Sequence, residues 1–222
     1  MPELTLFYSP GACSLAAHSA LREWGAPFDL RRVVLAKGEH LKPDYLELNP
    51  HARVPLLIID GKAARENSGI LTWIGLQSGL YPKAGSYDAA KCGEWLGWMT
   101  SSVHIAFAMI WRGERFSPDK ALHPAIRQHG YTLVGQYFAE IDDRLGNAPF
   151  TVGKALTVAD FNLLPFYRWG GRIGLDMSVY PNWGAHSARM LERASVRDAL
   201  AEEEISLQDT LPLPEGVKAP GR

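Results

Sequence analysis

Near the start of the chain, the spacing of apolar residues changes from that of a strand to that of a helix. Residues 3–8 alternate apolar and polar side chains, as expected for a strand, whereas residues 14–24 carry apolar side chains every three or four positions, as expected for a helix. Pro10-Gly11 breaks the first pattern. Residues 28–35 are rich in β-branched side chains and predict a second strand, which a right-handed crossover places parallel to the first. These residues therefore predict a βαβ unit.

The pattern then continues to the end of a first domain. It predicts a short helix, two strands joined by the tight turn Asp60-Gly61, and a helix that Gly79 ends. These elements lie at residues 42–48, 54–60, 62–66 and 67–78. The complete order is βαβαββα, and we assign it to residues 1–82.

Strand patterns end at the stretch 81–87, which contains Pro, Gly and Ser and which we interpret as a domain linker. Residues 87–210 predict an all-helical second domain. Its helices are expected at about 87–116 and 124–145, from 157, and near 183–193 and 196–204. The final residues 211–222 are rich in Pro and Gly, so we expect a flexible tail.

One helix start in the second domain accounts for an acidic residue without a catalytic role. Thr157 can cap the helix, Asp160 can complete a capping box with it, and Leu156 can pack against Phe161. We therefore assign Asp160 a folding role and leave it out of the candidate site.

Composition narrows the classes of partner. The chain has 222 residues, 46 % of them hydrophobic, with a formal net charge of −1 and a pI of about 6.7. This balance favours a small neutral or mildly anionic ligand over nucleic acid or an anionic membrane surface. We find no apolar stretch of membrane-spanning length and no leader pattern, so we expect a cytoplasmic protein. Cys13 and Cys92 have no zinc or disulfide spacing, and we predict no metal site.

Cys13 directly precedes the first predicted helix. Unpaired N–H groups and the helix dipole favour an anion there, which would lower the thiol pKa from its usual value of about 8.5. The same position would suit the thiolate of a bound ligand. The alternative is that Cys13 is a small buried hydrophobic residue, as lone cysteines often are.

Two further stretches of the first domain suggest recognition of a peptide-like ligand. A cis bond at Val54-Pro55 would turn the Val54 backbone outward for strand-like hydrogen bonds, although an ordinary trans proline is the alternative. Glu66 could pair with a ligand ammonium, while the helix start at Asn67-Ser68 attracts a carboxylate, although these residues could also be only a helix cap.

His104 lies in the long helix that begins the second domain. The residues that share its face are mostly small or polar, which indicates a cleft more than a packed core. They are Gly97, Thr100, Ser101, Ala108 and Trp111. A structural role for His104 is the alternative.

Taken in order, several motifs make the chain similar to the glutathione transferases, most closely the bacterial beta class. The motifs are YSPGACSLAAH, NPHARVPLL, the helix start ENSGI, WLGWMTSSVH and LTVAD. The resemblance covers nearly the whole chain. It implies a thioredoxin-like N-terminal domain, an all-helical C-terminal domain and a homodimer.

The resemblance also implies roles for individual residues. Cys13 and His104 match catalytic positions, with Cys13 contacting the glutathione sulfur. The expected glutathione-binding residues are Tyr8, Ala12, Leu35, Arg53, Val54, Pro55, Glu66 and Asn67. Aromatic walls for an electrophile are expected from Trp98, Phe107 and Trp111.

The chain departs from the family pattern at three positions. Asn67 stands where Ser is common, Ala52 replaces a frequent Gly, and Ile105 replaces a basic residue often found after the histidine. The glycyl carboxylate of glutathione then needs another cation, for which Arg53 and Lys37 are both candidates.

We therefore predict a detoxifying transferase that conjugates the glutathione thiol, as co-substrate, to small hydrophobic electrophiles. One alternative is a glutathione-dependent disulfide or peroxide reductase that uses Cys13 as a single thiol. The other is a binding protein that kept the fold without catalysis. Neither nucleic acid nor a membrane is an expected partner.

Overall fold

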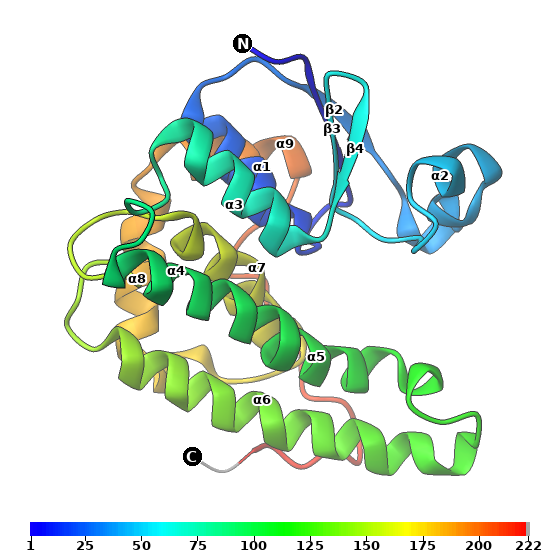
Figure 1. Cartoon of the computed structure of the whole chain (residues 1–222). Coiled ribbons are helices and arrows are strands. Elements are labelled where there is room, and N and C mark those ends of the chain that lie inside the picture. Colours follow the sequence, from blue (N-terminus) through cyan, green and yellow to red (C-terminus); the bar gives the residue numbers. More distant parts are fainter. Residues whose placement is uncertain (221–222) are drawn as a thin grey trace.

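The N-terminal domain is built on one mixed sheet. In the computed structural model, which describes residues 1–220, the strand order is β2-β1-β3-β4 (Figure 1). β1 is parallel to β2 and antiparallel to β3, and β4 is antiparallel to β3. The parallel pair confirms the predicted βαβ unit. The bounds are Leu4–Tyr8 for β1, Asp29–Arg32 for β2, Leu56–Ile59 for β3 and Lys62–Arg65 for β4.

Two helices of this domain lie on the same side of the sheet. α1 (Ser14–Trp24) and α3 (Asn67–Ser78) contact each other, and they also contact β1 and β4, respectively. The short helix α2 (Pro43–Leu48) lies on the other side, away from both (Figure 1). The predicted order βαβαββα is therefore confirmed.

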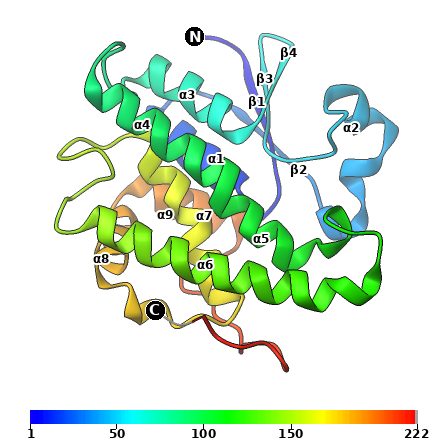
Figure 2. The same ribbon diagram turned by 60° about the horizontal axis from the view of Figure 1, so that its bottom comes forward.

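Residues 87–220 form an all-helical domain, as predicted, whose longest helix, α6, runs along one side of the molecule (Figures 1 and 2). Its helices are α4 (Tyr87–Trp98), α5 (His104–Trp111), α6 (His123–Leu145), α7 (Val158–Arg172), α8 (Pro181–Leu191) and α9 (Ala194–Glu203).

The single helix expected over residues 87–116 is interrupted. A π-helical turn, Met99–Val103, separates α4 from α5. Within it, the Thr100 hydroxyl donates a hydrogen bond to the Leu96 carbonyl (2.9 Å), a contact that tends to bend helices. Because such a turn holds an extra residue, it changes which side chains of α5 face the first domain.

The two domains share one hydrophobic core. α1 packs against α7 and α9 as well as against α3. Its buried side chains include Ala16, Ala17 and Ala20, whose small size allows neighbouring helices to approach on several sides. Buried residues from both domains form a single cluster, so the first domain is held in place by the second.

The capping box predicted at the start of α7 is present. Asp160 is fully buried and accepts hydrogen bonds from the backbone N–H groups of Thr157 (2.8 Å) and Thr151 (2.7 Å). Its carboxylate also lies 3.0 Å from Nε2 of the buried His186. Asp160 thus joins three segments of the helical domain, in keeping with its predicted folding role.

The last described segment, residues 211–220, makes specific contacts with the helical domain, and its expected flexibility stays a prediction. The Leu211 N–H donates to the Gly171 carbonyl (3.0 Å), and the Gln128 side chain forms two hydrogen bonds with the Lys218 backbone. Leu213 packs against the core of the helical domain. Pro and Gly disfavour a helix here, but they do not prevent these contacts. Residues 221–222 of the expected tail lie outside the described residues.

Two global features can be stated for residues 1–220. No helix in this range is both long enough and apolar enough to cross a membrane. No group of three or more His, Cys, Asp or Glu side chains in this range is placed to hold a metal ion.

Replacing Asp160 with Ala is expected to lower the free energy of unfolding by about 3 kcal/mol, because buried donors on three segments lose their acceptor. Urea denaturation followed by circular dichroism measures the change. Asp198→Ala, at an exposed position on α9, is the control and should have little effect. Equal stability of the two variants would contradict the assigned role.

Candidate functional site

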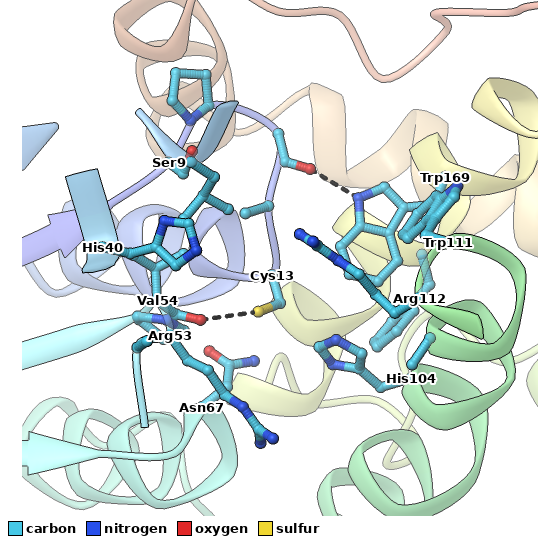
Figure 3. A pocket seen from close by; sticks show the side chains of 18 of the residues that line it. Ser9, Cys13, His40, Arg53, Val54, Asn67, His104, Trp111, Arg112 and Trp169 are labelled. Carbon is cyan, nitrogen blue, oxygen red and sulfur yellow. Dashed lines mark hydrogen bonds between the residues drawn. The ribbon is translucent and has the colours of Figure 1, made fainter. Parts of the chain in front are cut away.

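A cleft of about 620 Å³ lies between the two domains (Figure 3). This volume is typical of small-molecule sites, which span roughly 300–1,000 Å³. The walls come from residues 9–13, 32–40, 52–55 and 66–67 of the first domain and from α5 and α7 of the second. Ten of the predicted site residues line it: Ala12, Cys13, Leu35, Arg53, Val54, Pro55, Glu66, Asn67, His104 and Trp111.

The loop that leads into α1 is held by the second domain. The Gly11 N–H donates to Oε2 of Glu203 on α9 (2.7 Å), and the Gly11 carbonyl accepts from the indole N–H of Trp169 on α7 (2.7 Å). Gly11 has a φ of 69°, and a Cβ at this position would collide with the Arg168 guanidinium. The positive φ therefore favours glycine here, and any larger residue would also require the Arg168 side chain to move.

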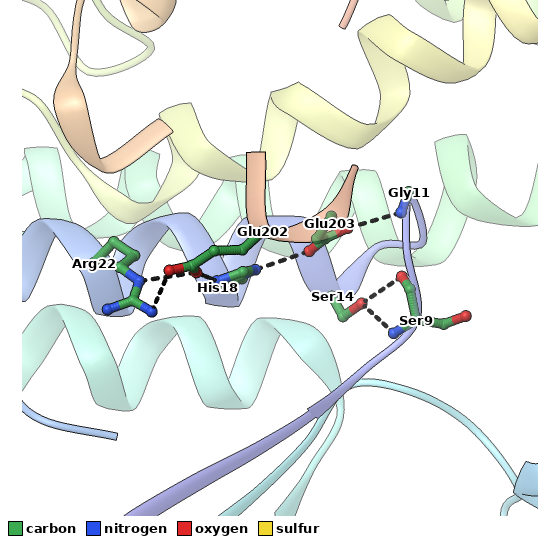
Figure 4. Close-up of polar contacts among 7 residues, drawn as sticks. All are labelled: Ser9, Gly11, Ser14, His18, Arg22, Glu202 and Glu203. Carbon is green, nitrogen blue, oxygen red and sulfur yellow. Dashed lines mark hydrogen bonds and ion pairs between the residues drawn. The ribbon is translucent and has the colours of Figure 1, made fainter. Parts of the chain in front are cut away.

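A buried polar network between α1 and the end of α9 stabilises this loop (Figure 4). The two ring nitrogens of His18, which is fully buried in α1, face Oε1 of Glu203 (3.0 Å) and Oε2 of Glu202 (2.7 Å). Arg22 also donates to Glu202. The end of α9 is thus tied to α1 and to the Gly11 peptide through adjacent carboxylates.

Cys13 precedes α1, as predicted, but its thiol is not activated. Burial raises the Cys13 pKa to about 12, although the backbone N–H groups of Cys13 and Ser14 act to lower it. The Sγ–H donates to the Val54 carbonyl (3.4 Å). The prediction of a thiolate with a lowered pKa is therefore wrong for the unliganded site, because desolvation outweighs the helix end.

The Val54-Pro55 peptide bond is cis, as the first of the two sequence interpretations proposed. The Arg53 carbonyl just before it accepts hydrogen bonds from the Tyr45 hydroxyl (2.6 Å) and the Asn49 side-chain amide (2.7 Å). These contacts hold the segment so that the Val54 carbonyl faces Cys13 (Figure 3).

The start of α3 contributes an acid and an unpaired acceptor to the cleft. Glu66 has a φ of 66°, a conformation uncommon outside glycine and frequent at ligand sites. The Asn67 side-chain amide donates to Oδ1 of Asn162 on α7 (2.9 Å). This leaves Oδ1 of Asn67 buried without a hydrogen-bond partner among the described residues. Asn67 therefore offers a ligand an acceptor and connects the α3 end to the second domain.

His104 faces the cleft from the start of α5. Its ring packs edge-on against Trp169 (5.3 Å between centroids) and Phe166 (6.0 Å). Burial, together with the charges of Arg53 and Arg115, lowers the His104 pKa to about 4. The imidazole is therefore neutral at pH 7 and can donate one hydrogen bond while accepting another.

The comparisons with known proteins match both halves of the chain. Sequence models of the glutathione S-transferase N-terminal and C-terminal domains match residues 11–77 and 115–194. The glutathione S-transferase GST-4.5 of Xanthomonas campestris is 32 % identical over 203 residues, which cover 90 % of this chain and 98 % of that protein.

Solved structures agree with this match. The beta-class glutathione S-transferase of Sphingomonas chungbukensis is 35 % identical with a TM-score of 0.79, covering 91 % of this chain and all of that one. A glutathione transferase homologue from Sulfitobacter with bound glutathione has a TM-score of 0.86 at 27 % identity, covering 93 % and 100 % of the two chains. The chain belongs to the glutathione S-transferase family. The resemblance stated from its motifs is confirmed.

Three residues assigned from the family resemblance do not line the cleft of this transferase. Tyr8 is buried inside the first domain beside His18, and burial raises its pKa. Trp98 packs against Trp95 and Tyr137. Phe107 is fully buried in the second-domain core. Trp98 and Phe107 are expected as walls for an electrophile, but Trp98 contacts Tyr137 of α6, and Phe107 contacts Phe138 of α6 and Trp169 of α7.

No sequence motif predicts several other residues that line the cleft. Asn162, Phe166 and Trp169 come from α7, which reads simply as a buried helix. Lys37, one candidate for the glycyl carboxylate, is not in the cleft lining, whereas Arg53, the other candidate, is. Contacts between elements distant in the chain decide these positions, so no local pattern could reveal them.

Alkylation of Cys13 by iodoacetamide should be slow near neutral pH and should rise about tenfold per pH unit up to about pH 10, because only the thiolate reacts and the pKa is about 12. Peptide mapping by mass spectrometry separates Cys13 from Cys92, and free glutathione is the reference thiol. A rate that levels off below about pH 8 would contradict the raised pKa.

Replacing Glu203 with Gln should lower the free energy of unfolding by about 3 kcal/mol, because His18 loses a buried charged partner. It should also weaken ligand binding in the cleft by loosening the Gly11 loop. Urea denaturation and glutathione calorimetry measure the two effects. Glu215→Gln, at an exposed position away from the cleft, is the control. Indistinguishable variants would show that the loop does not depend on Glu203.

Proposed function

We propose that this protein binds glutathione in the cleft and conjugates its thiol to a small electrophile with an apolar body. The observation that carries the proposal is the cleft itself, in which a peptide-binding backbone edge, an acid beside a helix start and a histidine from the second domain face one another. Family membership and the glutathione-bound Sulfitobacter structure support the choice of ligand.

Each part of the tripeptide has a complementary group in the cleft. The γ-glutamyl ammonium would pair with Glu66 and with the unpaired Oδ1 of Asn67, while the N–H groups at the start of α3 take its carboxylate. The cysteinyl backbone would pair with the Val54 backbone as an added strand. Arg53 would then neutralise the glycyl carboxylate.

Because its pKa is raised, Cys13 would act as a hydrogen-bond donor and not as the nucleophile. When the cysteinyl N–H of glutathione takes the Val54 carbonyl, the Cys13 Sγ–H loses its present acceptor and can turn to the glutathione sulfur. As a thiol that stays protonated, it would stabilise the glutathione thiolate by hydrogen bonding at the α1 start. The neutral His104 would donate to the same sulfur or to the developing charge on the electrophile.

Burial of Cys13 argues against the monothiol reductase alternative, because that mechanism needs an accessible thiolate on the protein. Measurable turnover of an electrophile would distinguish a conjugating enzyme from a non-catalytic binding protein. The homodimer and the role in detoxification stay predictions from the family resemblance, and the cytoplasmic location stays a prediction from the sequence pattern.

The proposal predicts that the protein binds glutathione in calorimetry and accelerates its reaction with chlorodinitrobenzene. Glu66→Gln should weaken glutathione about tenfold, because the ligand ammonium loses its charged partner. Glu47→Gln, an exposed position on α2 outside the cleft, is the matched control. Cys13→Ala should keep glutathione affinity and lower the turnover number by about tenfold or less.

Absence of glutathione binding by the parent protein would reject the proposal. Binding with no turnover of any electrophile would favour the binding-protein alternative. Complete loss of turnover in Cys13→Ala, together with a covalent glutathione adduct on Cys13 in the parent protein, would favour the reductase instead.

A further inference from the structure

The cleft is strongly cationic although the whole chain carries a net charge of only −1. Among the described residues that line it, Glu66 is the only acid. Six arginines line the same space: Arg32, Arg53, Arg112, Arg115, Arg168 and Arg172. An excess of one charge sign within a cleft concentrates ligands of the opposite sign.

Only some of these arginines are neutralised within the protein. Arg168 forms an ion pair with Asp209 (2.6 Å), and Arg32 lies 3.6 Å from Glu204. The other four, Arg53, Arg112, Arg115 and Arg172, form no ion pair with any residue among 1–220. Their charges are available to a ligand.

Arg112 and Arg115 are presented together by the end of α5. The helix ends at Trp111 with Arg112 as its C-cap, and the tight turn Gly113–Arg115 follows, closed by a hydrogen bond from the Arg115 N–H to the Arg112 carbonyl (2.9 Å). Figure 3 shows Arg112 reaching into the cleft from the helical domain, with His40 on the opposite wall. Trp111, the residue before Arg112, also lines the cleft.

These positive groups influence one another without an intervening carboxylate. Burial lowers the Arg115 pKa, and the charges of Arg53 and Arg112 lower it further, against a weaker opposing effect of Glu114. Burial likewise lowers the His40 pKa, together with Arg112 and Arg115. Nδ1 of His40 is buried and lacks a hydrogen-bond partner among the described residues. An anion placed between these groups would relieve their repulsion and satisfy open donors.

Glutathione alone does not use this charge. In the binding mode proposed above, on which this inference rests, the start of α3 holds the γ-glutamyl carboxylate and Arg53 holds the glycyl carboxylate. Arg112 and Arg115 are then left over, and both line the cleft together with Trp111.

We propose that the second substrate carries a carboxylate, which Arg112 and Arg115 bind, and an apolar body that lies against Trp111. Guanidinium groups match the planar, two-oxygen geometry of a carboxylate. The enzyme therefore prefers acidic electrophiles over neutral ones of the same shape.

Two glutathione conjugates test this preference without relying on turnover. Glutathione displaces chloride from para-chloro-dinitrobenzoate in solution, which gives an S-aryl conjugate with a carboxylate, and the methyl ester of the same arene gives its neutral counterpart. Calorimetry on the parent protein should find the acid conjugate about tenfold tighter than the ester. In the double variant Arg112→Gln, Arg115→Gln, the ratio should fall to about one while ester and glutathione affinities stay within about twofold.

Arg127→Gln removes an exposed arginine outside the cleft and should leave the ratio unchanged. Equal affinity of the parent protein for both conjugates would overturn the inference while leaving the proposed function intact. An equal loss of affinity for glutathione and both conjugates in the double variant would also overturn it, because the arginines would then serve the glycyl carboxylate. If the parent protein binds neither glutathione nor the conjugates, the proposed function itself fails.

Discussion

The Gly11 peptide is the point on which the rest of the site depends. Its N–H is held by the buried carboxylate of Glu203 and its carbonyl by the indole of Trp169, so two helices of the second domain fix the loop that places Cys13. Glu203 is tied in turn to His18 on α1, the helix that this loop begins. Buried charged hydrogen bonds of this kind are costly to leave unmade, which makes the loop geometry well defined.

This arrangement explains why the thiol at the helix start is buried rather than reactive. The loop places Cys13 next to the Val54 carbonyl, in a buried position. Burial there raises the Cys13 pKa by more than the N–H groups at the helix start lower it. A protein thiol in this setting serves better as a hydrogen-bond donor than as a nucleophile. In the proposed mechanism the reacting sulfur is therefore that of the ligand, which would bind in a cleft lined by several arginines.

Much of the fold could be predicted because its signals are local. The period of the apolar residues predicts each strand and most helices, and the capping box at Thr157 and Asp160 marks the start of α7. The helix expected over 87–116 was wrong in one respect, since the π turn at Met99–Val103 divides it. The contacts of residues 211–220 carry no such local signal, because composition says nothing about the surface on which these residues lie.

By itself the sequence determined the order of the elements, the family to which the chain belongs and most of the residues with which the first domain lines the cleft, because these depend on short motifs. Only the tertiary structure decided the protonation of Cys13 and His104, the exclusion of Tyr8, Trp98 and Phe107 from the cleft, and the grouping of Arg53, Arg112 and Arg115. The physical reason is that burial and charge proximity depend on contacts between segments far apart in the chain. No local pattern of residues predicts how deeply a group is buried or which charges lie near it.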